Sequence, residues 1–169
     1  MRPGGGKAKG AAFEREVCRK LSMWLSGGVN EDVLWRSAMS GGRSTVAAKK
    51  GKRLAAQAGD ISCIHPCGHP FISKFYVECK AYRDLRFAGL LTEKGELVEF
   101  WNETRKQAKS YDKLPLLVAR QNQLPPFVGL CSNAVVSLNL WKADIIYARN
   151  IDLHIVMFDD FLKKAACPG

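Results

Sequence analysis

Residues 75–82 place the strongest constraint on the fold, because their side chains alternate between apolar and polar positions over eight residues. Successive side chains of a β-strand point to opposite faces, so one face of this strand is predicted to pack on a core. Glu78 and Lys80 share the other face, where such a pair can hold a divalent metal and position a water molecule. The same pair can also be an ordinary ion pair on a solvated sheet. The side chains predicted to face the core are Phe75, Val77, Cys79 and Ala81.

Gly59 and Asp60 open the strand that is predicted before this one. Residues 60–65 and 71–81 both read as strands, and the Gly and Pro residues between them predict the turn of a hairpin. A hairpin would bring Asp60 close to Glu78, and two neighbouring carboxylates repel each other unless a cation lies between them. Asp60 can equally be a turn residue after Gly59, where Asp is common.

The first helix, predicted over residues 11–26, carries Glu14 on its apolar side. At about 100° per residue Glu14 falls within the apolar arc that begins at Phe13, whereas Glu16 falls well outside it. A buried carboxylate needs a partner, which a metal site or a lysine would supply. Alternatively Glu14 stays exposed in the first turn, where acids interact favourably with the helix dipole. The rest of the arc consists of Val17, Cys18, Leu21, Trp24 and Leu25.

The remaining segments complete one α/β domain over residues 11–169, preceded by a flexible basic tail over residues 1–10. A second helix is predicted over 98–113, and Asp159 is predicted to cap a last helix over 160–166. Short strands are predicted over 33–36, 116–119, 127–131, 134–138 and 154–158.

The net charge of +10 is concentrated in the first third of the chain. Residues 1–59 carry twelve basic and four acidic side chains, whereas residues 60–169 carry fourteen and twelve. This asymmetry favours a polyanion as partner, most often nucleic acid, over an anionic membrane or a merely soluble basic protein. A basic loop or arm is predicted over 41–58. The side chains expected to engage backbone phosphates are Arg36, Arg43, Lys49, Lys50, Lys52 and Arg53.

The six cysteines are expected to be free thiols, since the N-terminus lacks an apolar signal-peptide core and no apolar run could span a membrane. Cys63, His65, Cys67 and His69 are possible zinc ligands. One residue separates each from the next, and this spacing makes a tetrahedral arrangement difficult. We therefore expect a hairpin turn there and no structural zinc.

Taken together, Glu14 on the first helix, Gly59-Asp60 and Glu78-Cys79-Lys80 resemble the PD-(D/E)XK nuclease superfamily. Gly59 stands where the superfamily often has a proline. The resemblance implies a restriction-endonuclease-like core, with a central mixed β-sheet flanked by α-helices in the order α-β-β-β-α-β. It also implies a DNA endonuclease in which Asp60, Glu78 and Glu14 bind Mg²⁺, or alternatively Mn²⁺, and Lys80 orients the attacking water.

Residues 10–17 and 35–42 are further similar to archaeal-type and phage-encoded Holliday junction resolvases. This resemblance implies a homodimer acting on branched or four-way DNA in the cytoplasm of a bacterial or phage-infected cell. It places Ser40 in the site, and Gln107 of the second helix near the scissile phosphate. Two other functions stay open: a nuclease of the same superfamily that cuts duplex, flap or single-stranded DNA, and a DNA-binding module that has lost catalysis.

Overall fold

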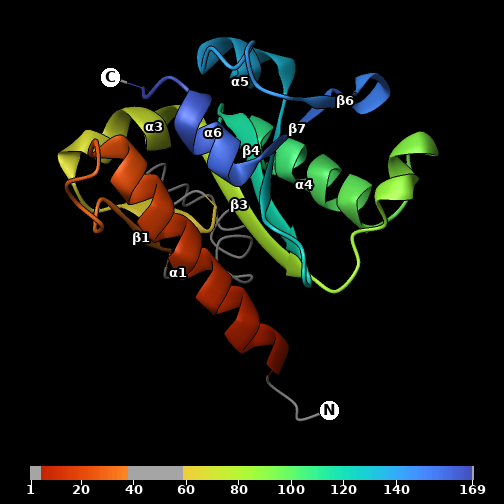
Figure 1. The fold of residues 1–169 in the computed structure, drawn as a ribbon, viewed down its shortest axis with the longest axis horizontal. Coiled ribbons are helices and arrows are strands. Elements are labelled where there is room, and N and C mark those ends of the chain that lie inside the picture. The colour runs from red at the N-terminus through yellow and green to blue at the C-terminus, as the bar shows by residue number, and fades with distance from the viewer. Residues whose placement is uncertain (1–4, 38–58, 169) are drawn as a thin grey trace.

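The computed structural model describes residues 5–37 and 59–168, which form a mixed five-stranded sheet with helices on both faces (Figure 1). The strand order is β3-β4-β5-β7-β6; β3 and β4 are parallel, and the other neighbours are antiparallel. This architecture confirms the predicted fold class. The strands are β3 (Phe75–Tyr82), β4 (Leu114–Gln121), β5 (Phe127–Leu130), β6 (Ile146–Ala148) and β7 (Leu153–Met157).

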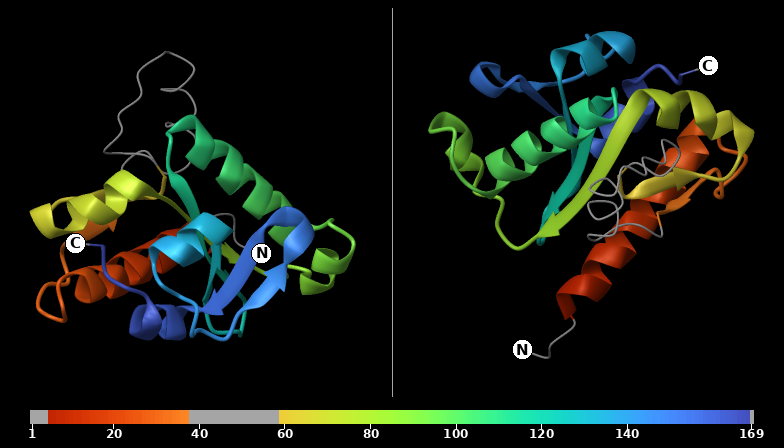
Figure 2. Two further views of the ribbon diagram at one scale, coloured as in Figure 1. Left: turned by 90° about the horizontal axis from the view of Figure 1, so that it is seen from above. Right: turned by 180° about the vertical axis from the view of Figure 1, so that it is seen from behind.

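Helices α1 (Gly5–Leu25) and α6 (Phe158–Lys164) lie on one face of this sheet, and α4 (Glu96–Ser110) lies on the other (Figure 2). Trp24 of α1 and Phe161 of α6 pack with their ring centroids 5.4 Å apart. Strand β4 is covered on both faces, and its apolar run from Leu116 to Ala119 is completely buried. Continuous apolar runs of this kind are typical of strands with both faces packed.

A second, two-stranded sheet lies beside α1. Strands β1 (Leu34–Arg36) and β2 (Ile61–Cys63) are antiparallel, with Arg36 opposite Ile61. Immediately before β2, Gly59 forms a parallel bridge with Val77 of β3. The small sheet and the large sheet therefore meet at Gly59 and Asp60.

The predicted hairpin between residues 60–65 and 71–81 is wrong. Strand β2 pairs with β1, and the segment from His69 to Lys74 forms helix α3, so β3 starts only at Phe75. Phe71 and Ile72 of α3 are buried, and a helical turn achieves this burial as well as a strand would. Apolar runs this short do not distinguish the two conformations.

Three other boundaries differ from the predictions. Helix α1 begins at Gly5, so residues 5–10 are helical, whereas the predicted helix began at residue 11. Residues 134–138, predicted as a strand, lie largely in helix α5 (Ser132–Ser137). Helix α6 begins at Phe158, which places Asp159 in its first turn and not at the cap. The predicted basic arm over 41–58 lies outside the described residues, and no helix within them could span a membrane.

Candidate active site

Asp60 is held against the edge of β3 by the backbone. Its N–H donates to the Val77 carbonyl over 2.9 Å, and the Cys79 N–H donates to its carboxylate Oδ2 over 2.8 Å. On the other side, the Ser37 N–H donates to the Asp60 carbonyl over 2.7 Å. With only 8% of its surface exposed, Asp60 is a buried carboxylate in a defined position.

Gly59 is the residue that allows this approach. Its φ is +88°, and a Cβ placed there would lie 2.4 Å from the Val77 carbonyl oxygen. A side chain at position 59 would therefore both strain the backbone and push Asp60 away from β3.

Gly59→Ala is expected to lower the free energy of unfolding by about 3 kcal/mol, because backbone strain and a steric clash add. Gly28→Ala is the matched control, since Gly28 has the same φ of +88° and a Cβ added there would have nothing within 4 Å. Urea denaturation of both variants measures the difference. Equal losses in the two variants would show that the contact with Val77 is unimportant.

Glu78 and Lys80 project from the face of β3 that meets α4, as the strand periodicity predicts. Lys80 Nζ lies 2.7 Å from Glu78 Oε1, and the Tyr76 hydroxyl donates to Glu78 Oε2 over 3.4 Å. The Lys80 ammonium also lies 5.5 Å from the ring centroid of Phe100 on α4. Glu78 thus has a neighbour on each side and stays partly accessible.

Electrostatics couple these groups. Burial raises the pKa of Asp60 to about 7, with further contributions from the charges of Glu78 and Glu14, and against the opposing effects of the Cys79 N–H and Lys80. Burial alone would lower the pKa of Lys80, but Glu78 and Asp60 more than compensate and raise it above its ordinary value. Lys80 is therefore a cation at neutral pH. The charge of Lys80 is not enough to bring the pKa of Asp60 back to its ordinary value.

Glu14 points inward, as the helical periodicity predicts, with 13% of its side chain exposed. Among the described residues, its ion-pair partner is Arg36 of β1, which the sequence pattern had assigned to DNA binding. Glu14 is close enough to raise the pKa of Asp60. The structure therefore brings Glu14, Asp60, Glu78 and Lys80 into one electrostatic neighbourhood.

For the other residues predicted to belong to the site, the described part of the chain shows no contact with this group of carboxylates and lysine. Gln107 lies on α4 and donates to Glu103 of the same helix over 2.7 Å. Ser40, Arg43, Lys49, Lys50, Lys52 and Arg53 lie outside the described residues.

A family model described as "Phage putative PDDEXK endonuclease" matches residues 5–167, almost the entire chain. The chain belongs to this family. This membership confirms the superfamily expected from the sequence and makes the chain a nuclease of the PD-(D/E)XK type. Nucleases of this type generally use divalent metals, and their substrate is DNA. No curated protein and no solved structure matches the chain.

The donor set of this PD-(D/E)XK nuclease fits a hard divalent cation. No cluster of three His, Cys, Asp or Glu side chains forms a ready-made cage within residues 5–37 and 59–168. Mg²⁺ does not need one, because it is usually bound by one or two carboxylates together with waters and substrate phosphates. The repulsion from Glu78 that helps to raise the pKa of Asp60 is what a cation between the two carboxylates would relieve.

Two neighbours of the nuclease site were missed by the sequence reasoning. Tyr76 was detectable, because it precedes Glu78 by two residues on the same strand and so shares its face. The Arg36–Glu14 pair was not detectable, since it joins β1 to α1 through tertiary packing.

The Cys-His segment forms a local turn. His65 Nδ1 accepts from the Cys67 N–H over 3.3 Å and caps the 3₁₀ turn η2 (Pro66–Gly68). Strand β2 ends before this turn and α3 follows it, so the turn does not connect two strands as predicted. The expectation that no zinc binds here stays a prediction.

Proposed function

We propose that the chain is a metal-dependent DNA endonuclease in which Asp60 and Glu78 hold Mg²⁺, with Mn²⁺ as the alternative. The observation that carries the proposal is a buried carboxylate, Asp60, whose pKa is raised to about 7 beside a second carboxylate and a protonated lysine. A divalent cation between two such carboxylates relieves their mutual repulsion and competes with the proton on Asp60. Glu14 of α1 is proposed to contribute to the same metal site, directly or through water.

A metal held by Asp60 and Glu78 would supply a Lewis acid that polarises the scissile phosphate and offsets charge on the leaving 3′ oxygen. Lys80 stays protonated, so it acts as a donor and not as a general base. Its ion pair with Glu78 holds it on the face of β3 where that carboxylate lies, and there it orients the attacking water and offsets charge in the transition state. Ser40 and Gln107 are assigned to the scissile phosphate on the resemblance to resolvases.

The proposed substrate is branched DNA, with the four-way junction as the first candidate. This choice rests on the sequence around Glu14 and Ser40, and the basic residues between 43 and 53 would hold the flanking phosphates. Resolving a junction requires two symmetric cuts, so we propose a homodimer. An interface formed by the segments after residue 124 is supported by exposed apolar side chains at this edge of the sheet. These are Ile146 and Tyr147 on the edge strand β6 and Met157 on the neighbouring strand β7.

A cleavage panel tests the proposal. Junction, fork, blunt duplex and single-stranded DNA are incubated with Mg²⁺, with Mn²⁺ and with EDTA, and the oligomeric state on the junction is measured in parallel. We expect metal-dependent cuts with the junction preferred and a dimer on it. Efficient cutting of the component duplexes would show that the enzyme does not require a junction. The absence of cutting with either metal would favour a DNA-binding module that has lost catalysis.

A further inference from the structure

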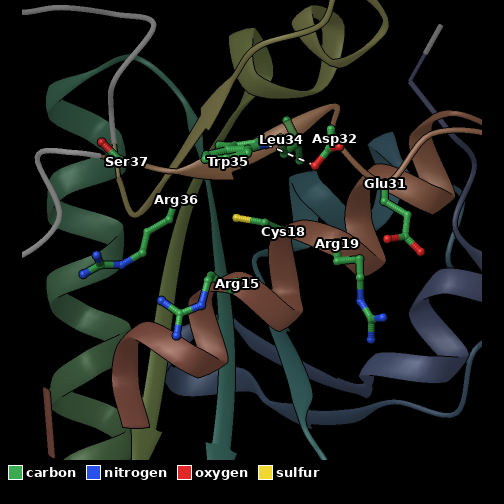
Figure 3. A pocket seen from close by; sticks show the side chains of 9 residues that line it. All are labelled: Arg15, Cys18, Arg19, Glu31, Asp32, Leu34, Trp35, Arg36 and Ser37. Carbon is green, nitrogen blue, oxygen red and sulfur yellow. Dashed lines mark hydrogen bonds between the residues drawn. The ribbon is translucent and has the colours of Figure 1, made fainter. Parts of the chain in front are cut away.

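A pocket of about 420 Å³ opens between α1 and β1 (Figure 3). Two of its lining residues link it to the site, because Arg36 pairs with Glu14 and the Ser37 N–H donates to the Asp60 carbonyl. A molecule in this pocket would therefore lie beside the scissile phosphate.

One wall of the pocket carries an exposed aromatic ring. Trp35 exposes 55% of its surface, and its indole N–H donates to Asp32 Oδ1 over 3.3 Å. This bond fixes the orientation of the ring. Leu34 and Cys18, both nearly completely buried, add apolar lining. An exposed indole of fixed orientation beside an apolar surface suits a flat, uncharged ring system as a stacking partner.

The helix side of the pocket carries two arginines. Arg15 and Arg19 lie one turn apart on α1, and within the described part of the chain neither has an ion-pair partner. The acids of the pocket, Glu31 and Asp32, lie at the end away from Arg36 and Arg15, and Arg19 lies at the same end as Glu31 (Figure 3). Anionic groups are therefore favoured along Arg15 and disfavoured near Glu31.

We propose that this pocket binds an unpaired nucleotide of the DNA substrate, with its base stacked on Trp35 and its phosphate against Arg15. Bases inside a duplex have both faces covered by their neighbours, so only an unpaired base offers a face to an aromatic side chain. The inference rests on the proposed nuclease function and deepens it. It makes DNA with an unpaired nucleotide beside the cut site the preferred substrate class.

The test measures binding in EDTA, where no cleavage occurs, with a labelled oligo-dT strand and a blunt duplex of equal length. Trp35→Ala is expected to weaken binding of the single strand about tenfold and to leave the duplex unchanged. Trp35→Phe, which keeps an aromatic face, should bind the single strand nearly as well as the wild type. Trp141→Ala is the matched control, since Trp141 is also exposed, at 64%, and lies outside the pocket.

Equal losses for both probes, or no loss for either, would overturn the pocket assignment. The variant Arg15→Gln should also reduce the salt dependence of single-strand binding by about one phosphate contact. An unchanged salt slope would contradict the placement of the phosphate.

The pocket and the proposed function can fail separately. If Trp35-dependent binding of the single strand persists but no metal supports cleavage, the nuclease proposal fails and the pocket stands. If the wild type cuts DNA and Trp35→Ala retains wild-type single-strand affinity, the pocket assignment fails and the nuclease proposal stands.

Discussion

Replacing Glu78 by glutamine is expected to reduce metal-dependent cleavage by about 10³-fold, equal to about 4 kcal/mol of transition-state stabilisation, while DNA binding survives. The amide keeps the size of the side chain but removes the charge that pairs with Lys80 over 2.7 Å and that would bind the metal. Single-turnover cleavage at saturating DNA measures the loss. Lys80→Ala should give a comparable loss, because the attacking water is then no longer oriented.

Glu99→Gln is the control for this variant, since Glu99 is an exposed carboxylate in the first turn of α4. It should cleave like the wild type. Undiminished Mg²⁺-dependent cleavage by Glu78→Gln would show that the metal is held elsewhere and would remove the assignment of the site.

Asp60→Asn is expected to make the metal-free protein more stable above pH 7 while abolishing cleavage. The pKa of Asp60 is raised in the folded state from 3.8 to about 7, chiefly by burial. The folded protein therefore binds more protons than the unfolded chain between these values, and the free energy of unfolding falls as the pH rises through this window. Asparagine carries no charge, so this loss disappears, and its side-chain oxygen can still accept from the Cys79 N–H.

Urea denaturation in EDTA at pH 5 and pH 8 tests this expectation. Between these two pH values the wild type should lose of the order of 1–3 kcal/mol relative to Asp60→Asn. Added Mg²⁺ should restore stability to the wild type at pH 8 and have little effect on the variant. Parallel pH profiles for the two proteins would contradict a raised pKa at Asp60.

Local periodicity predicted the orientation of the site residues well. Two-residue alternation placed Glu78 and Lys80 on one face of β3, and the helical repeat placed Glu14 on the inward side of α1; both orientations are observed. These predictions succeed because the direction of a side chain depends on the repeat of its own element.

Secondary structure was less predictable where short segments depend on distant partners. Val135 and Val136 favour a strand by their β-branched side chains, yet they lie in α5. The Ser132 N–H at the start of this helix donates to the carboxylate of Asp152, twenty residues later. A cap supplied from so far along the chain leaves no local signal, and here it outweighs intrinsic propensity.

The amino-acid pattern therefore determined which carboxylates and which lysine are available and on which faces they lie, and it favoured a polyanion as partner. Tertiary structure alone decided how they meet. Asp60 reaches Glu78 through a parallel bridge at Gly59 and not through a hairpin, Glu14 pairs with Arg36, and Trp35 lies beside two arginines. Strand pairing and helix packing between remote segments are set by burial of the shared core, and no local repeat in the chain encodes them.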